Sequence, residues 1–111
     1  MSFNLLILYA CHDDAKFDMQ YYLHVHMPLV ERYWRPAGLL GWKVIEFGAH
    51  HQSGDYAGCP PPRIANLMTW EDEESYCAAS KGPGASEICA DAMTFSNRKP
   101  IFITGTTVDM G

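Results

Sequence analysis

The feature that most constrains this chain is a pair of strand-like segments that are apolar on both faces. Successive side chains of a strand point to opposite sides of the sheet, so each strand offers two sets of residues. In the strand expected over residues 3–10, these sets are Phe3, Leu5, Ile7 and Tyr9 against Asn4, Leu6 and Leu8. In the strand expected over 63–70, they are Ile64, Asn66, Met68 and Trp70 against Ala65, Leu67 and Thr69. Both faces of the sheet therefore need cover.

The order of strand-like and helical segments predicts a single α+β domain over residues 1–111. Strands are expected at 3–10, 39–47, 63–70 and 100–108. A helix capped by Asp13 or Asp14 is expected to run to Trp34, and a second helical region to follow Glu71, interrupted at 82–84. The segment 48–62, rich in Gly, Pro and His, is expected to be a loop. This order is βαββαβ, with a four-stranded antiparallel sheet and two helices on one face.

Two helices cover only one face of such a sheet, which leaves a second apolar face. A patch of that size is larger than monomers normally leave exposed. We therefore expect a homodimer in which two sheets pack face to face about a twofold axis. The alternative is a monomer whose loop, 48–62, folds over the exposed face.

The charge and the cysteine pattern exclude several classes of partner. Eight basic residues against thirteen acidic ones give a net charge of −5, so no nucleic-acid partner is expected. No segment is long enough to span a membrane, and none forms a basic amphipathic face for lipid. The N-terminal segment lacks the features of a signal peptide, and the four cysteines form no CxxC pair. We expect reduced thiols and a cytoplasmic protein.

The first helix carries the strongest candidates for chemistry. Tyr22 and His26 are four residues apart and share the apolar face of this helix. A phenol and an imidazole facing a sheet are suited to orienting a substrate and to general acid–base catalysis. A core histidine bonded to a backbone carbonyl is the equally weighted alternative. Pro28 predicts a kink or break near His24, which itself is expected to face solvent.

The candidate substrate-binding residues are amides and apolar side chains near this pair. Asn66 lies among apolar residues in mid-strand, where an unpaired amide costs about 1–3 kcal/mol. It is interpreted either as a substrate-orienting group or as a partner of Asn4 or of the main chain. The full set is Asn4, Asn66, Met19, Tyr33 and Trp70. No metal site and no cofactor are expected, because no ligand spacing or nucleotide-binding motif is present.

Three stretches of the sequence resemble the EthD-like family. Residues 18–29 read DMQYYLHVHMPL, a Tyr-Tyr pair followed by His-x-Pro-Leu, and 38–44 read GLLGWKV. Residues 91–95, DAMTF, with the strand that begins at Ile101, are similar to the C-terminal part of the family. The resemblance implies a ferredoxin-like fold that dimerises through its sheets as a dimeric α+β barrel. The loop at 59–62 and the break at 82–84 depart from the family pattern.

Related barrels include cofactor-free monooxygenases, lactone isomerases, haem proteins and lyases of polyketide intermediates. Our leading hypothesis is a small cofactor-independent enzyme, of lyase or monooxygenase type, acting on an aromatic or polyketide-like apolar molecule. It would bind between the first helix and the sheet, with His26 as acid–base and Tyr22, Asn4 or Asn66 orienting it. The alternatives are a non-catalytic protein that binds an apolar ligand and, less favoured, a barrel with His26 as a haem ligand.

Overall fold

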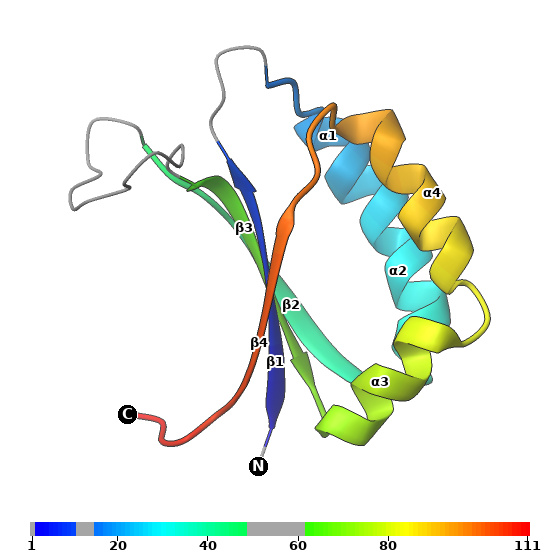
Figure 1. Cartoon of the computed structure of the whole chain (residues 1–111), viewed down its shortest axis with the longest axis vertical. Coiled ribbons are helices and arrows are strands. Elements are labelled where there is room, and N and C mark those ends of the chain that lie inside the picture. Colours follow the sequence, from blue (N-terminus) through cyan, green and yellow to red (C-terminus); the bar gives the residue numbers. More distant parts are fainter. Residues whose placement is uncertain (1, 11–14, 49–61) are drawn as a thin grey trace.

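A computed structural model describes residues 2–10, 15–48 and 62–111 of the chain (Figure 1). The strands are β1 (Phe3–Ala10), β2 (Leu39–Glu46), β3 (Pro62–Trp70) and β4 (Ile101–Thr106). The helical segments are α1 (Met19–Tyr21), the π-helix η1 (Tyr22–His26), α2 (Met27–Trp34), α3 (Glu73–Lys81) and α4 (Ala85–Phe95). The predicted βαββαβ order is confirmed. The predicted loop at 48–62 lies almost entirely outside the described residues, and so does the alternative to a dimer in which this loop folds over the sheet.

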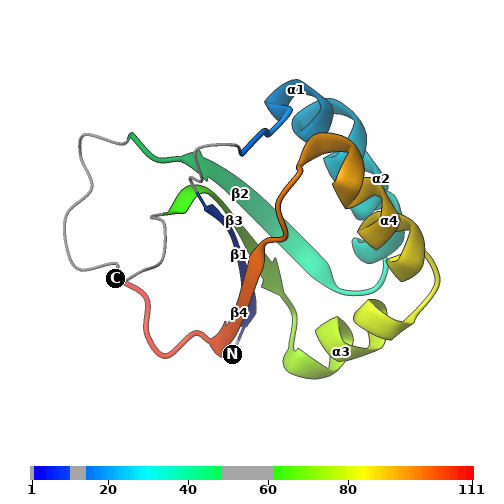
Figure 2. The ribbon, with the colours of Figure 1, turned by 45° about the horizontal axis from the view of Figure 1, so that its top comes forward.

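The four strands form one antiparallel sheet in the order β2-β3-β1-β4, which twists beneath the helices (Figure 2). The central pair sets the register of the whole sheet, with Leu5 opposite Met68 and Ile7 opposite Asn66. Residues directly opposite one another point to the same face. Asn66 therefore shares the face of Ile7, whereas Asn4, opposite Thr69, points to the other side.

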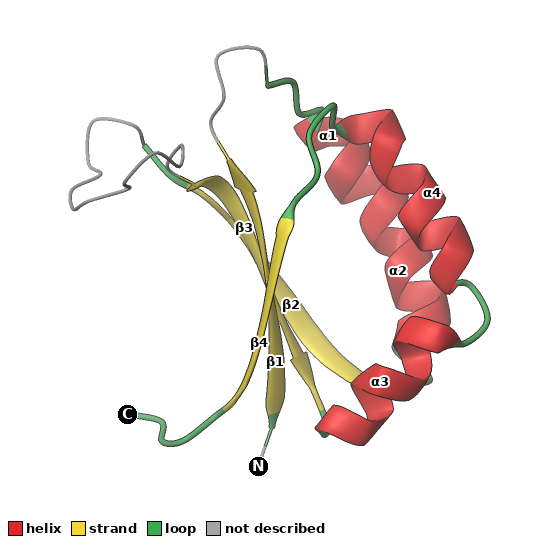
Figure 3. Ribbon diagram, viewed as in Figure 1, coloured by secondary structure: helices red, strands yellow, loops and turns green. Residues whose placement is uncertain are grey.

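All the helical segments lie on one side of the sheet (Figure 3). The core fills the space between the sheet and the helices. It is built from apolar side chains of every helix and strand except β4. Its fully buried members include Leu5, Tyr22, Met27, Val30, Leu39, Ile64, Met68 and Trp70. Every residue of β4, the edge strand, is exposed in the single chain. The helices thus cover one face, as predicted.

The first helical region begins later than predicted. Its N-cap is Asp18, whose side chain accepts a hydrogen bond from the Tyr21 backbone N–H at 3.1 Å, and the helix starts at Met19. The expected caps, Asp13 and Asp14, lie outside the described residues. Asp18 therefore satisfies one of the free N–H groups of the first helical turn.

The second helical region breaks at 82–84, as predicted. Gly84 adopts a φ of +87° at the start of α4, and a Cβ atom there would overlap the ring of Tyr33. A side chain at this position is disfavoured both by backbone conformation and by the close approach of α2. The break therefore allows α3 and α4 to pack at different angles on the sheet, with α4 alongside α2.

Two further predictions concern thiols and membranes. Cys77 and Cys89 are exposed free thiols, as expected, while Cys11 and Cys59 lie outside the described residues. Among the helices that the structure describes, none combines the length and the apolar character needed to cross a bilayer.

Candidate functional site

The π-helix η1 brings Tyr22 and His26 together. Pro28 has no backbone N–H, so a regular α-helical bond from residue 28 to residue 24 is missing. The chain widens at this point, and the Met27 N–H bonds to the carbonyl of Tyr22, five residues back. The two rings then stack, with centroids 5.4 Å apart and planes at 15°. π-Helical turns of this kind occur often at functional sites. The predicted break near His24 is confirmed, and His24 itself is exposed.

An aromatic cluster encloses this pair. The Phe95 ring of α4 lies 4.5 Å from His26 and 4.8 Å from Tyr22, centroid to centroid. The Phe17 ring lies 5.0 Å from Tyr22 and 5.3 Å from Phe95, and Tyr9 of β1 closes the cluster beneath them. His26 is only 6 % exposed. The imidazole therefore lies in an apolar setting with few polar neighbours.

A carboxylate from the other helical region reaches into this setting. Oδ2 of Asp91, on α4, lies 2.9 Å from Nδ1 of His26. The Tyr21 hydroxyl donates a hydrogen bond to Oδ1 of the same carboxylate at 2.5 Å. Asp91 thus links two side chains of the first helical region, Tyr21 and His26, to α4, and it lies 65 positions from His26 in the sequence. The ring planes and the carboxylate together define the orientation of the imidazole.

Burial lowers the pKa of His26 below its ordinary value of 6.5. The hydrogen bond and the negative charge of Asp91 act in the opposite direction, but the loss of hydration is the larger effect. The imidazole is therefore neutral at pH 7. Tyr21, whose hydroxyl donates to Asp91, has its pKa raised by that bond.

This lowered pKa predicts how the stability of the fold changes with pH. The unfolded chain takes up a proton on His26 near pH 6.5, whereas the folded chain does so only at lower pH. The stabilisation that comes from this difference in pKa is fully present above pH 6.5. It is lost as the pH falls from 6.5 through the lower pKa of His26 in the folded chain. The free energy of urea unfolding should fall more steeply in the wild type than in His26→Gln, between about pH 7.5 and about pH 5. His24→Gln, on the exposed side, should keep the wild-type slope; equal slopes in all three proteins would contradict this assignment.

A second polar group lies behind Tyr22. The Asn66 amide nitrogen lies 2.6 Å from the Tyr22 hydroxyl oxygen and 3.4 Å from the sulfur of Met27. Asn66 is fully buried, and its Oδ1 has no hydrogen-bond partner among the described residues. Burial raises the pKa of Tyr22 to about 12, although hydrogen bonds from Asn66 and Tyr9 favour the phenolate. Tyr22 therefore remains a neutral hydroxyl at physiological pH.

The structure brings together three of the residues predicted for the site and separates the others. Tyr22, His26 and Asn66 are in one connected group. The expectation that Asn4 and Asn66 face one cavity is wrong, because the antiparallel register places them on opposite faces. The Asn4 amide instead donates to the Thr107 hydroxyl at 2.8 Å.

The remaining three predicted residues lie elsewhere in the core or between helices. Met19 is partly buried and packs against the core one turn before Tyr22. The Tyr33 hydroxyl donates to Glu87 at 2.7 Å and so joins α2 to α4. Trp70 is fully buried between Trp34 and Tyr76, about 13 Å along β3 from Asn66 at strand spacing. The placement of Trp70 is that of a core residue.

Sequence reasoning missed Asp91, the residue in most direct contact with His26. It belongs to a stretch that resembles the EthD-like family, but the sequence offers no partner for it. The available signal is its spacing: Asp91 lies four residues before Phe95, on the same helical face as a buried ring. A carboxylate on the inner face of a helix indicates that a hydrogen-bonding or cationic partner lies nearby.

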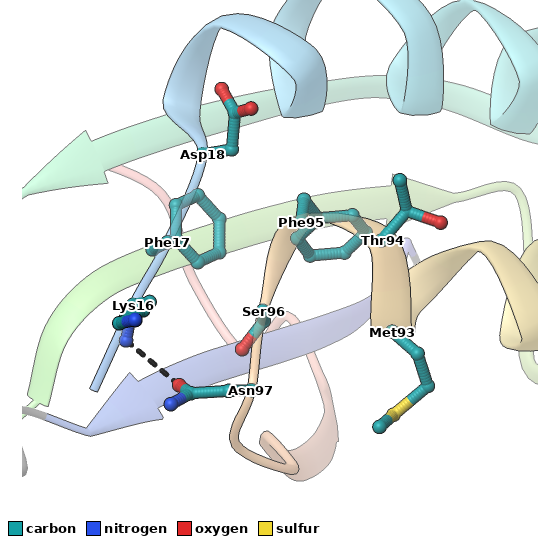
Figure 4. Close-up of a pocket in the computed structure, with 8 residues that line it drawn as sticks. All are labelled: Lys16, Phe17, Asp18, Met93, Thr94, Phe95, Ser96 and Asn97. Carbon is teal, nitrogen blue, oxygen red and sulfur yellow. Dashed lines mark hydrogen bonds between the residues drawn. The ribbon is translucent and has the colours of Figure 1, made fainter. Parts of the chain in front are cut away.

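A hollow lies on the outer side of the aromatic cluster. It is lined by Lys16, Phe17, Asp18, Met93, Thr94, Phe95, Ser96 and Asn97, and has a volume of about 360 Å³ (Figure 4). Its two walls are held together by backbone bonds, including Asp18 N–H to the Phe95 carbonyl at 2.8 Å. Phe17 and Phe95 line this hollow and also contact Tyr22. These two rings therefore stand between the hollow and the buried pair.

Metal binding has no support in the part of the chain that the structure describes, where no three His, Cys, Asp or Glu side chains gather into a metal-binding group. His26 and Asp91 form a pair without a third such ligand. The polar groups that the structure describes around His26 are its neutral imidazole, the Asp91 carboxylate and the Tyr21 and Tyr22 hydroxyls.

Comparison with known proteins yields no matching family model and no match among curated proteins, but many solved structures share the fold. An EthD-like protein from Ralstonia eutropha JMP134 is 23 % identical, with a TM-score of 0.78 over 97 % of this chain and 93 % of that one. An EthD (ethyl tert-butyl ether D) family protein from Bacillus halodurans C-125 is also 23 % identical, with a TM-score of 0.68 over 97 % and 100 %.

A third similar structure is that of a characterised enzyme. SnoaB, a cofactor-independent oxygenase from Streptomyces nogalater, is 11 % identical, with a TM-score of 0.65 over 98 % of this chain and 95 % of SnoaB. The chain is therefore an α+β protein with the ferredoxin-like fold of this group. The resemblance to the EthD-like family, seen first in the sequence, is confirmed at the level of the fold.

Proposed function

We propose that this chain is a small cofactor-independent enzyme, of lyase or monooxygenase type, that acts on an aromatic or polyketide-like molecule. The observation that supports this proposal most directly is the buried, neutral His26, held on one side by Asp91 and stacked on Tyr22. A neutral imidazole in an apolar setting is suited to accept a proton from a phenol or from an acidic C–H group. Proton removal of this kind begins both lyase and cofactor-independent oxygenase reactions.

The surroundings of His26 favour a planar apolar substrate. The Phe17, Tyr22 and Phe95 rings offer faces and edges for stacking, and Tyr22 and Asn66 supply polar groups for orientation. We propose that the substrate reaches His26 from the hollow lined by 16–18 and 93–97, with the Phe17 and Phe95 rings turned aside. The hollow itself also carries polar side chains, including Lys16 and Asp18, whereas the aromatic surroundings with few polar groups that such ligands favour lie behind Phe17 and Phe95, around His26.

His26→Gln tests this function. It removes the proton acceptor while keeping a side chain of similar polarity, so turnover of an aromatic or polyketide-like substrate should fall by about 10²–10⁴-fold. Product formation is followed by liquid chromatography and mass spectrometry over a panel of such substrates. His24→Gln, an exposed neighbour on the same helical turn, should keep full activity.

The other outcomes separate this proposal from its main alternative. Undiminished turnover in His26→Gln would exclude His26 as the acid–base group. If the wild type binds the panel tightly but turns none of it over, the chain is a non-catalytic binding protein and not an enzyme. A ligand that binds the wild type and His26→Gln equally would also favour that reading.

We also propose that two copies of the chain pack through the outer face of the sheet. This face carries apolar residues from all four strands, and Lys43 lies beside Leu67 at its β2 edge; the apolar residues are Leu6, Leu8, Ile45, Leu67, Ile101 and Ile103. The described helices all lie on the opposite side (Figure 3), so none of them covers it. Ile101 and Ile103 are 55 % and 50 % exposed in the single chain. An isologous contact between two such faces would bury them.

A further inference from the structure

Both oxygens of the Asp91 carboxylate are engaged, one by each of two side chains of the first helical region. Oδ2 lies 2.9 Å from His26 Nδ1, and Oδ1 accepts the Tyr21 hydroxyl proton at 2.5 Å. Among the described residues, no hydrogen bond reaches the other ring nitrogen, Nε2, of His26. The carboxylate therefore contacts one side of the imidazole and leaves the opposite nitrogen available.

We propose that Asp91 and Tyr21 are positioning residues that keep the His26 proton on Nδ1, so that Nε2 is the atom that accepts the substrate proton. This proposal rests on the proposed function for the role of Nε2, but the tautomer itself is a property of the free protein. Neither residue touches the reacting atoms; each acts through His26.

The tautomer follows from the chemistry of the carboxylate. An ionised carboxylate has only acceptor sites, so the Nδ1 atom that faces Asp91 must be the donor. A neutral imidazole carries a single N–H, and Nε2 is then left with its lone pair. Stacking on Tyr22 and contact with Phe95 limit rotation of the ring, so the two nitrogens cannot exchange places by a ring flip without disturbing the cluster.

Tyr21 sets how strongly Asp91 acts on His26. Its hydroxyl proton draws negative charge toward Oδ1, and this weakens the attraction between the carboxylate and a protonated imidazole. The titratable groups in contact with His26 among the described residues are Asp91 on α4 and Tyr22 on its own helix. Tyr21 reaches it only through Asp91. The three residues therefore form one chain from hydroxyl to carboxylate to imidazole.

The test is nitrogen-15 NMR of the histidine rings in the full-length protein, with His26 assigned by its loss in His26→Gln. The wild type should show Nδ1 protonated and Nε2 unprotonated at neutral pH. Asp91→Asn offers an amide that can donate to Nδ1, so it should shift the population toward the Nε2–H tautomer and lower the pKa of His26 further. On any substrate that the wild type turns over, kcat should fall on the order of 10²-fold or more.

Tyr21→Phe should act in the opposite direction on the same titration. Without the hydroxyl, the full charge of Asp91 faces His26, so the pKa of His26 should rise while the Nδ1–H tautomer is kept. Opposite shifts from two neighbouring variants are not expected from a loss of packing. Tyr33→Phe is the matched control, because it removes an equivalent bond between α2 and α4, from Tyr33 to Glu87, and should leave both the tautomer and the pKa of His26 unchanged.

An Nε2–H tautomer in the wild type would overturn the proposal, and this measurement does not require the Asp91 or Tyr21 variants to fold. Unchanged His26 titration in both Asp91→Asn and Tyr21→Phe would also overturn it. The predicted NMR pattern combined with full turnover in His26→Gln would reject the proposed function and leave the positioning role in place. An Nε2–H tautomer combined with an inactive His26→Gln would reject the positioning role and leave the proposed function in place.

Discussion

Leu6→Lys is expected to convert the proposed dimer to a monomer without unfolding the chain. Leu6 lies on the outer face of the central strand β1, opposite Leu67 on one side and Ile103 on the other. In a dimer that packs through this face, the new ammonium group would be buried with no acidic partner. An unpaired buried charge costs about 3–5 kcal/mol, which weakens association by at least about 100-fold. In the monomer, the long lysine side chain can reach water across the open face.

Sedimentation equilibrium and light scattering on size-fractionated protein measure this change directly. The matched control is Val25→Lys, which places the same charge at a half-exposed position in the helical layer. Val25→Lys should remain a dimer with the wild-type association constant. A wild-type protein that is already monomeric at micromolar concentration would contradict the proposed interface, and so would a dimeric Leu6→Lys.

The strands could be predicted from the sequence because their pattern is local. The short, largely apolar segments at residues 3–10 and 63–70 each signal a strand without reference to the rest of the chain. The same is true of the helix break at 82–84 and of the irregularity before Pro28. At both of these irregular points, proline or glycine imposes the local backbone geometry.

The site was only partly predictable because it depends on pairing between distant segments. Asn4 and Asn66 both stand out as amides among apolar side chains, but only the sheet register decides whether they share a face. A shift of one residue would have put them together. Tyr22 and His26 could be paired because they lie on one helix, whereas Asp91 comes from 65 positions away and reaches His26 only once α4 packs beside η1.

Trp70 shows a second reason why the site was only partly predictable. A large aromatic residue in the core and one that lines a ligand cavity look alike in a sequence. We expect Trp70→Ala to lower the free energy of unfolding by about 3–5 kcal/mol, the usual cost of emptying a buried aromatic site. Its ring is fully buried, and its centroid lies 5.4 Å from that of Trp34 and 5.5 Å from that of Tyr76. The cavity would remove one packing partner from each of these two rings.

Trp70→Phe separates the volume of this residue from its polar atom. The Trp70 indole N–H is buried and has no hydrogen-bond partner among the described residues, so removing it releases a penalty of about 1–3 kcal/mol. That gain offsets part of the lost packing, and we expect Trp70→Phe to be destabilised by less than about 1.5 kcal/mol. Urea unfolding at one fixed protein concentration measures both variants, since the proposed dimerisation would make stability depend on concentration.

The same two variants decide the role of Trp70 in ligand binding. If Trp70 is a core residue, Trp70→Phe should bind 2-naphthol as tightly as the wild type does, because Trp70 lies about 13 Å along β3 from Asn66, the residue that contacts Tyr22. A loss of naphthol binding in Trp70→Phe with unchanged stability would instead extend the binding site along the whole length of the sheet. The stability of Trp70→Ala then separates the two readings, since a cavity-lining tryptophan already exposed to ligand or water would cost far less to remove.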